Sequence, residues 1–379
     1  MRTQVAIVGA GLAGLHAALL LERAGIACRV FEARQRMGGR ILSVDDGRPQ
    51  EGVGDARGRY DLGPAWIWPD TQPLIRQLVA QLGLRMFPQQ TDGAYLAERA
   101  AARSVLRHEY GFTSEPPAMR LMGGMHSLVA AIASRLPPAA VLLSHRVTAM
   151  ARDASGDVLI HATSNGGPVQ WTADSVILAM PPRLLADTIR FEPALPAPLL
   201  ARMASIPTWM AAHAKVMAIY DTPFWREQGL SGSASSDIGP LVEIHDASPD
   251  DGLPALFGFV GLPAQARLTL GPDALQRKAV AQLARLFGSA ASRPRAVRAM
   301  DWSADADTAT AADSVAPSGH PAYGPIHSPG AAWEGRLEFG GTEVAFHDGG
   351  YLEGALAAGV AAVERVLARA AAAPGLASR

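Results

Sequence analysis

The chain has 379 residues, a length that suits two domains and leaves ample volume for a hydrophobic core. Charged residues make up 18% of it and the formal net charge is −1, which excludes the basic footprint of a nucleic-acid-binding protein. No run of lysine or arginine indicates adhesion to an anionic membrane. The single cysteine, Cys28, excludes an internal disulfide and a cysteine-rich metal site, and we expect no metal.

The N-terminal segment has the pattern of a dinucleotide-binding βαβ unit. An apolar strand from Val5 runs into Gly9, Gly11 and Gly14 at G-x-G-x-x-G spacing, followed by a helical pattern and a second strand that ends at Glu32. We predict that the first glycine makes the tight turn, the second lets the backbone approach a pyrophosphate, and the third lets the helix pack on the strand. The Glu32 carboxylate, 21 residues after Gly11, is expected to accept hydrogen bonds from the adenosine ribose. With strand, helix, second strand and acid all present, a plain glycine-rich turn is the weaker interpretation.

The same segment has two competing interpretations, an export signal and a membrane span. Residues 5–21 carry no formal charge, but glycines interrupt them and no A-x-A cleavage pattern follows. A membrane span needs about 20 apolar residues. We therefore expect a cytoplasmic protein without a membrane anchor, either a monomer or a homodimer.

Two further glycine-containing stretches follow the βαβ unit. Gly38-Gly39-Arg40 predicts a second close approach of the backbone to the cofactor, with Arg40 near phosphate, although the glycine pair could also form only a turn. Residues 45–58 have the polar, glycine-rich composition of a loop or hairpin. The segment from Gly63-Pro64-Ala65 to Trp66 and Trp68 predicts a rigid turn whose aromatic rings flank a flat ligand.

The rest of the chain alternates strands and helices. Before residue 191 we expect a helix at 71–83, short strands alternating with turns over 84–119, a helix at 127–132 that returns to the dinucleotide domain, and strands at 141–150, 158–163 and 175–180. In the second domain we expect a helix near Leu199, strands at 211–220, 241–244 and 255–260, a helix at 272–287, and an irregular stretch at 301–318. The chain then returns through 336–343 to a last helix at 352–373.

Lys215 is unusual because the chain has only two lysines, and this one lies in the apolar strand at 211–220. Burying an ammonium group is costly unless it is paired, and burial lowers its pKa. The alternative is a lysine at a strand edge whose amine reaches solvent.

The order of these motifs resembles that of the flavin-containing amine oxidases, the monoamine and polyamine oxidase group, over nearly the whole chain. The matching pieces are Gly9/Gly11/Gly14, Glu32-Ala33-Arg34, Gly38-Gly39-Arg40, Asp61-Leu62-Gly63, Ala179-Met180-Pro181-Pro182, Gly341-Thr342-Glu343 and Gly350-Tyr351. The resemblance implies an α/β fold, with a Rossmann-like FAD-binding domain built from 1–75, 120–190 and 331–379. A second α+β domain for the substrate, with a mixed sheet and helices, would comprise 76–119 and 191–330.

The resemblance also implies FAD as the cofactor and assigns residues to it. Val147 would pack on the adenine side, Glu343 would hydrogen-bond the ribityl chain, and the last helix would direct its N-terminus at the flavin, with Gly349 and Gly350 allowing a close approach. A helix N-terminus stabilises nearby negative charge by about 0.3–1 kcal/mol. The cofactor-binding set predicted in this way is Gly9, Gly11, Gly14, Glu32, Ala33, Arg34, Gly38, Gly39, Arg40, Gly63, Pro64, Ala65, Trp66, Val147, Met180, Gly341, Glu343, Gly350 and Tyr351.

Three residues are predicted to serve catalysis: Lys215, Tyr351 and Trp66. In the family, the lysine at this place holds a water at flavin N5, and the tyrosine forms one wall of an aromatic cage. Many members also have a cysteine that joins the flavin covalently and an adjacent tyrosine as the second wall; here those places fall near Ala311 and Ala312. We therefore predict non-covalent FAD, an incomplete cage and, since the chain is shorter than typical members, a small substrate domain.

The function implied is oxidation of an amine, with hydride moving from its α-carbon to flavin N5, O2 reoxidising the flavin to give H2O2, and the imine hydrolysing to an aldehyde and ammonia or an amine. Two alternatives stay open. One is a C–C dehydrogenase such as a desaturase or a protoporphyrinogen-type oxidase, which the incomplete cage favours and Lys215 disfavours. The other is a flavin-binding protein without turnover. The scattered histidines His213, His245, His327 and His347 are interpreted as surface or packing residues.

Overall fold

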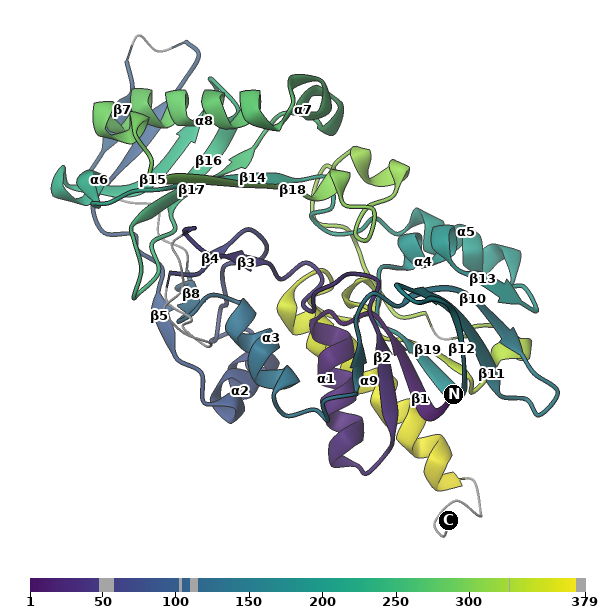
Figure 1. Ribbon diagram of the computed structural model, residues 1–379. Coiled ribbons are helices and arrows are strands. Elements are labelled where there is room, and N and C mark those ends of the chain that lie inside the picture. The colour runs from purple at the N-terminus through teal and green to yellow at the C-terminus, as the bar shows by residue number, and fades with distance from the viewer. Residues whose placement is uncertain (48–57, 102–103, 110–114, 327, 373–379) are drawn as a thin grey trace.

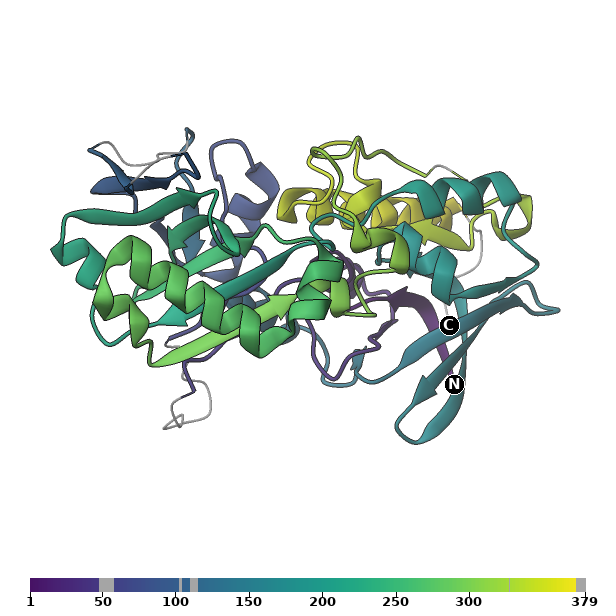
Figure 2. The same ribbon diagram turned by 90° about the horizontal axis from the view of Figure 1, so that it is seen from above.

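The computed structural model describes residues 1–47, 58–101, 104–109, 115–326 and 328–372. It has two lobes, each built on its own sheet, which lie side by side in both views (Figures 1 and 2). The loop expected at 45–58 lies largely outside the described residues.

The first lobe is organised around a sheet with the strand order β13-β10-β11-β12-β1-β2-β9, in which β19 also pairs with β12. The strands from β9 to β19 pair in parallel, as a βαβ fold requires, whereas β10, β11 and the first part of β12 form an antiparallel extension. The bounds are β1 Arg2–Val8, β2 Cys28–Phe31, β9 Val141–Leu142, β10 Arg146–Arg152, β11 Val158–Ser164, β12 Gly167–Leu178, β13 Arg190–Glu192 and β19 Leu337–Phe339.

Helices cover both faces of this sheet. Helix α1, Leu12–Arg23, and helix α9, Leu352–Ala372, pack against one face beside α3, His126–Ala133 (Figure 1). On the other face lie α4, Pro182–Thr188, and α5, Ala197–Ser205. Apolar side chains fill both interfaces, as expected of a sheet buried on two sides.

Helix α2, Pro73–Leu82, belongs to the same core. The Glu353 carboxylate at the start of α9 accepts 2.8 Å hydrogen bonds from the backbone N–H groups of Leu74 and Ile75, which are among the free donors at the N-terminus of α2. The domain boundary expected at residue 76 therefore falls inside a helix. The helix near Leu199 was expected in the second domain, and this is wrong, because Met203 of α5 is buried in the core of the first sheet. The division into domains otherwise stays a prediction.

The second lobe is a mixed sheet with the order β18-β14-β17-β16-β15-β6-β7, covered on its outer face by α8 (Figure 1). Helix α8 has the predicted bounds, Pro272–Phe287, but strands β15 and β18 were not anticipated from the sequence. The elements are β6 Ala94–Glu98, β7 Leu106–His108, β14 Ala214–Ile219, α6 Phe224–Glu227, β15 Leu230–Ser236, β16 Leu241–Asp246, β17 Ala255–Val260, α7 Ala264–Leu270 and β18 Ala296–Asp301.

Short elements complete the chain. Two-stranded sheets are formed by β3 Ser43–Val44 with β4 Tyr60–Asp61, and by β5 Met86–Pro88 with β8 Met119–Leu121. Single 3-10 turns occur at Ser289–Ser292, Trp302–Ala304, Ala311–Ser314, Ala331–Trp333 and Thr342–Val344.

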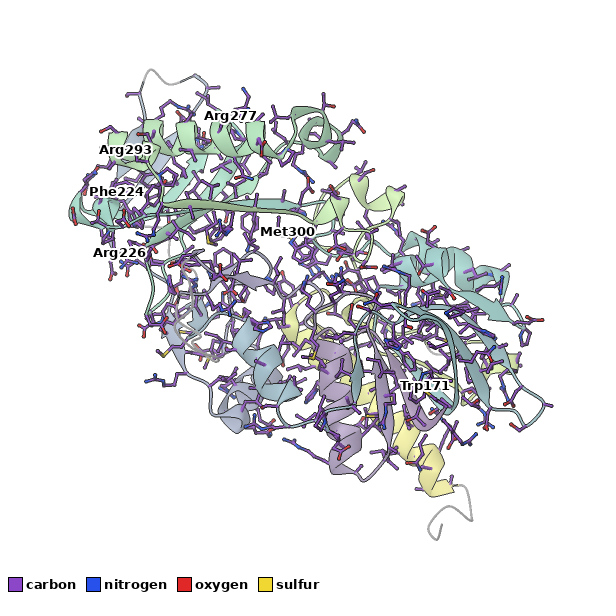
Figure 3. All side chains as sticks on the ribbon, in the orientation of Figure 1. Trp171, Phe224, Arg226, Arg277, Arg293 and Met300 are labelled. Atoms are coloured by element: carbon purple, nitrogen blue, oxygen red, sulfur yellow. The ribbon has the colours of Figure 1, made fainter. Side chains whose placement is uncertain are left out.

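The inner face of the second sheet is turned toward the first lobe. Tyr60 and Leu62 pack under it against Met217 and Phe257, and Met300 points the same way in Figure 3, whereas Arg277 lies on the outer face. This packing joins the two lobes and places β14 and β17 over the carboxyl ends of the parallel strands, where open α/β folds bind their ligands. No helix in the described part of the chain is both long and apolar enough to cross a bilayer.

Candidate active site

A cavity of about 360 Å³ runs between the lobes. Both lobes line it: the glycine-rich loop and Glu32 come from the first, and Lys215 and Phe259 from the second. Every residue predicted for the cofactor or for catalysis lines this cavity except Gly14. A largely apolar cavity with a few polar groups is typical of a cofactor site.

The glycine-rich loop has the geometry of a pyrophosphate site. Gly11 precedes α1 with φ −73° and ψ 179°, and a Cβ built on it would meet no atom within 4 Å, so the space beside it belongs to the cavity. Gly14 packs instead of lining the cavity, because a Cβ there would lie 2.0 Å from the Gly9 carbonyl oxygen. The Gly38 N–H donates to the Ala10 carbonyl at 2.8 Å, which brings the second glycine pair onto the first loop.

Glu32 directly follows strand β2 and lies beside the glycine-rich loop. Its carboxylate is 3% exposed and accepts from the backbone N–H groups of Ala10 at 2.8 Å and Arg34 at 2.9 Å. Each carboxylate oxygen has a second lone pair for a further donor such as a ribose hydroxyl. Ala33 and Val147 line the cavity beside Glu32, which fits an adenosine at this end.

Arg40 and Glu343 form an ion pair in the middle of the cavity. The Arg40 guanidinium lies 2.6 Å from Glu343 Oε1 and also donates to the Trp209 carbonyl. Glu343 is fully buried, and its Oε2 has no partner among the described residues. A buried acceptor of this kind requires a donor, and the hydroxyls of a ribityl chain supply one. These residues therefore fit a flavin dinucleotide.

Lys215 is buried, so the alternative of a lysine reaching solvent is wrong. Its side chain is 5% exposed, and its Nζ donates to the Gly63 carbonyl at 2.5 Å. The amine lies 4.6 Å from the ring centroid of Phe257 and 5.1 Å from that of Phe259, within range for cation–π attraction. Burial lowers the Lys215 pKa to about 8, while the Asp61 carboxylate acts in the opposite direction.

An aromatic wall connects Lys215 to the start of α9. Trp66 lies 5.7 Å from Phe257 and 6.4 Å from Trp68, whose ring meets Tyr351 edge-on at 6.5 Å. The Trp66 indole N–H donates to Gln89 at 2.8 Å, which fixes its orientation. The rings of this wall are inclined to one another by 49° to 90°, so together they form an apolar surface made of several facets.

The surroundings of Tyr351 differ from the expectation in two respects. Ala311 and Ala312, near which the family resemblance places the cysteine and the second aromatic wall of the cage, are exposed. Instead His320 stacks on Tyr351 with ring centroids 5.1 Å apart and planes within 8°. Gly350 was expected to make room for the cofactor, but a Cβ there would lie 2.7 Å from Trp209, so packing against this indole also requires glycine.

Sequence reasoning did not single out Trp209, His320 or the segment containing Asp307 and Thr308, although all but His320 line the cavity. These residues lie in irregular stretches without a sequence motif, so their closeness to the cavity is visible only in the folded structure. His213 was interpreted as a surface or packing residue, yet its half-buried side chain lines the cavity. Its Nδ1 has no partner among the described residues, and burial lowers the pKa of the ring. Across the described ranges no cluster of three or more acidic, histidine or cysteine side chains is arranged to bind a metal.

Comparison with known proteins agrees with this geometry. The family model of flavin-containing amine oxidoreductases matches residues 85–367, and that of NAD(P)-binding Rossmann-like domains matches residues 7–82. Flavin-containing amine oxidase A of Sus scrofa is 25% identical, over 96% of this chain and 84% of its own length. Wild-type putrescine oxidase, solved with putrescine bound, superposes with a TM-score of 0.76 at 22% identity over 97% of this chain and all of that one. Cyclohexylamine oxidase from Brevibacterium oxydans superposes with a TM-score of 0.76 at 22% identity, over 97% of this chain and 99% of that one.

The fold and the cavity thus define an FAD-dependent oxidoreductase. Since the first family model covers well over half of the sequence, the chain belongs to the flavin-containing amine oxidoreductases, and its activity is that of an amine oxidase.

Proposed function

We propose that the protein oxidises a primary or secondary amine with non-covalently bound FAD and O2, giving H2O2 and an imine that hydrolyses to an aldehyde and ammonia or an amine. The observation that carries this proposal is the buried Lys215 amine, held by Gly63 at the edge of the aromatic wall. When bound, FAD supplies the hydride acceptor and passes the electrons to O2. Action in the cytoplasm, as a monomer or a homodimer, stays a prediction.

The protein would mainly position the substrate and exclude water. Trp66, Trp68 and Tyr351 present flat apolar surfaces on which an alkyl or aryl chain can rest. Phe259 pairs with Lys215 on one neighbouring strand and with Glu243 on the other, so the three side chains point to the same face of the sheet. The pKa of Glu243 is lowered chiefly by its hydrogen bond with His245. Glu243 does not line the cavity and its side chain is exposed, so its charge would attract a cationic amine toward this face and not bind it.

Small aliphatic amines are the first candidates for the substrate. Two enzymes of the same fold are putrescine oxidase, solved with putrescine bound, and cyclohexylamine oxidase, and both compounds are aliphatic amines. The C–C dehydrogenase alternative has no comparable support, because it gives no role to a buried amine beside the aromatic wall.

The substrate proposal is tested with an aerobic assay over a panel of amines and matched alcohols. We expect H2O2 and aldehyde in equal amounts from at least one amine and from none of the alcohols. Flavin-containing protein that releases no H2O2 from any amine, but does so with a C–C substrate, would support the dehydrogenase alternative.

The attachment of the cofactor is tested separately. Because Cys28 is buried on β2 and is the chain's only cysteine, no thiol lies where a flavin ring could be joined. We expect acid precipitation to leave all of the yellow colour in the supernatant as intact FAD, identified by chromatography. Flavin that stays with the pellet after washing in denaturant would contradict non-covalent binding.

A further inference from the structure

A segment outside the Rossmann unit closes the adenosine end of the cavity. We call residues 303–308 the strap. Its Asp305 carboxylate and Thr308 hydroxyl both accept from Arg34 Nη2 at 2.8 Å, and Asp307 Oδ1 lies 2.5 Å from Arg146 Nη2. Arg34 follows β2, and Arg146 begins β10, so the strap connects to two strands of the first sheet.

The strap is folded and anchored at its other end as well. Backbone N–H groups of Thr308 and Ala309 donate to the Asp305 carbonyl at 2.9 Å, which holds it as a turn. Just before it, the buried Trp302 donates its backbone N–H to the His213 carbonyl at 3.0 Å and its indole N–H to the Leu62 carbonyl at 3.3 Å. The strap is therefore fixed on both lobes.

Its position relative to the cofactor follows from Glu32. In a dinucleotide-binding βαβ unit the acid that ends the second strand marks the ribose. Asp307 and Thr308 line the cavity together with Glu32, Arg34 and Arg146. They therefore lie at the adenosine end, next to Glu32.

One polar group of the strap, the Thr308 hydroxyl, still has a proton to donate there. The Thr308 hydroxyl accepts from Arg34, so its own proton is available to donate, and its side chain is buried, with the residue 2% exposed. Arg34 is only 13% exposed, and its guanidinium is already engaged with Asp305 and Thr308. Both hydrogen bonds use Nη2 and hold the guanidinium against the strap, and the direct cofactor contact expected of Arg34 stays a prediction.

We propose that the strap is part of the cofactor site: the Thr308 hydroxyl binds the adenosine half of FAD, Asp307 lines the site beside it through its ion pair with Arg146, and Arg34 is a positioning residue that holds the strap in place. The inference rests on the proposed non-covalent FAD. In a chain without a covalent tether, contacts of this kind retain the cofactor. Partly buried ion pairs such as Arg34–Asp305 are screened less by salt than exposed pairs, which contribute little.

The test uses ADP, which carries the adenosine half of FAD and no flavin. Its affinity for the full-length protein stripped of FAD is measured by calorimetry in four variants. Thr308→Val keeps the shape but removes the hydroxyl, whereas Thr308→Ser restores it. Asp305→Asn removes the charge that holds Arg34. Asp221→Asn breaks the exposed pair with Arg295 and serves as the control.

We expect Thr308→Val and Asp305→Asn to weaken ADP binding about tenfold each, which corresponds to about 1.4 kcal/mol. Thr308→Ser and Asp221→Asn should stay near the wild type, and FAD should dissociate faster from the two weakened variants. Unchanged ADP affinity in both, or equal losses in Thr308→Val and Thr308→Ser, would overturn the role of the strap. Wild-type protein that binds neither ADP nor FAD would overturn the cofactor proposal itself.

Discussion

Replacing Lys215 by methionine should slow the reaction of the reduced protein with O2 by on the order of a hundredfold, the magnitude seen when one charge-stabilising donor is removed from an active site. Negative charge develops on O2 as it accepts electrons, and a cation in a dry site stabilises that charge far more than it would in water. Methionine has a similar length and suits the apolar strand, so folding and FAD content should change little. Stopped-flow mixing of the reduced protein with O2 measures the rate directly.

The pH dependence provides an independent check of the same residue. The Lys215 pKa is lowered to about 8, so the amine is charged below this pH and neutral above it. The wild-type rate with O2 should therefore fall as the pH rises through about 8, and the Lys215→Met rate should not follow this step. Lys278, the other lysine of the chain, is exposed on α8, and Lys278→Met is the matched control. Equal O2 rates in the wild type and Lys215→Met would remove the main argument for an oxidase.

Replacing Gly11 by leucine should prevent stable FAD binding while leaving the fold intact. Gly11 has φ −73°, which any residue adopts, and its Cβ would project into open cavity. The leucine side chain would occupy the space of the pyrophosphate and displace its hydrogen bonds, which contribute about 1.5–3 kcal/mol each when charged. Affinity should drop by on the order of a hundredfold or more.

The control for this change is Gly166→Leu, in the β11–β12 hairpin and remote from the cavity. Calorimetric titration with FAD, and circular dichroism of the apoprotein, separate binding from folding. A Gly11→Leu protein that still purifies with one FAD per chain would show that the glycine-rich loop is not the pyrophosphate site.

Much of the architecture could be predicted because its signals are local. The glycine spacing, the strand ending at Glu32, and the proline and glycine that bound α2 and α8 are each read within a few residues. Lys215 could be singled out since burying a rare lysine in an apolar strand is costly. In these cases the chemistry of a short segment determines its structure.

The features that could not be predicted depend on contacts between distant segments. His320 reaches Tyr351 only because the loop that carries it is fastened to the start of α9: a Cβ on Gly349 would lie 2.6 Å from Tyr323, whose hydroxyl donates to the Pro207 carbonyl. The strap lies beside Glu32 through hydrogen bonds from Arg34 to Asp305 and Thr308, which are 271 and 274 positions away in the sequence. Strands β15 and β18 have small or charged residues at many positions, so their sequences do not predict strands. They are strands because they pair with neighbouring strands of the sheet.

Anaerobic titration of the FAD-containing protein with an amine tests amine oxidation most directly. We predict that one equivalent of a small aliphatic amine bleaches the yellow absorbance of one flavin, and that admitting O2 restores it with release of one H2O2. Flavin that stays oxidised with every amine tested, yet is bleached by dithionite and recovers in air, would contradict the assignment of this cavity to amine oxidation.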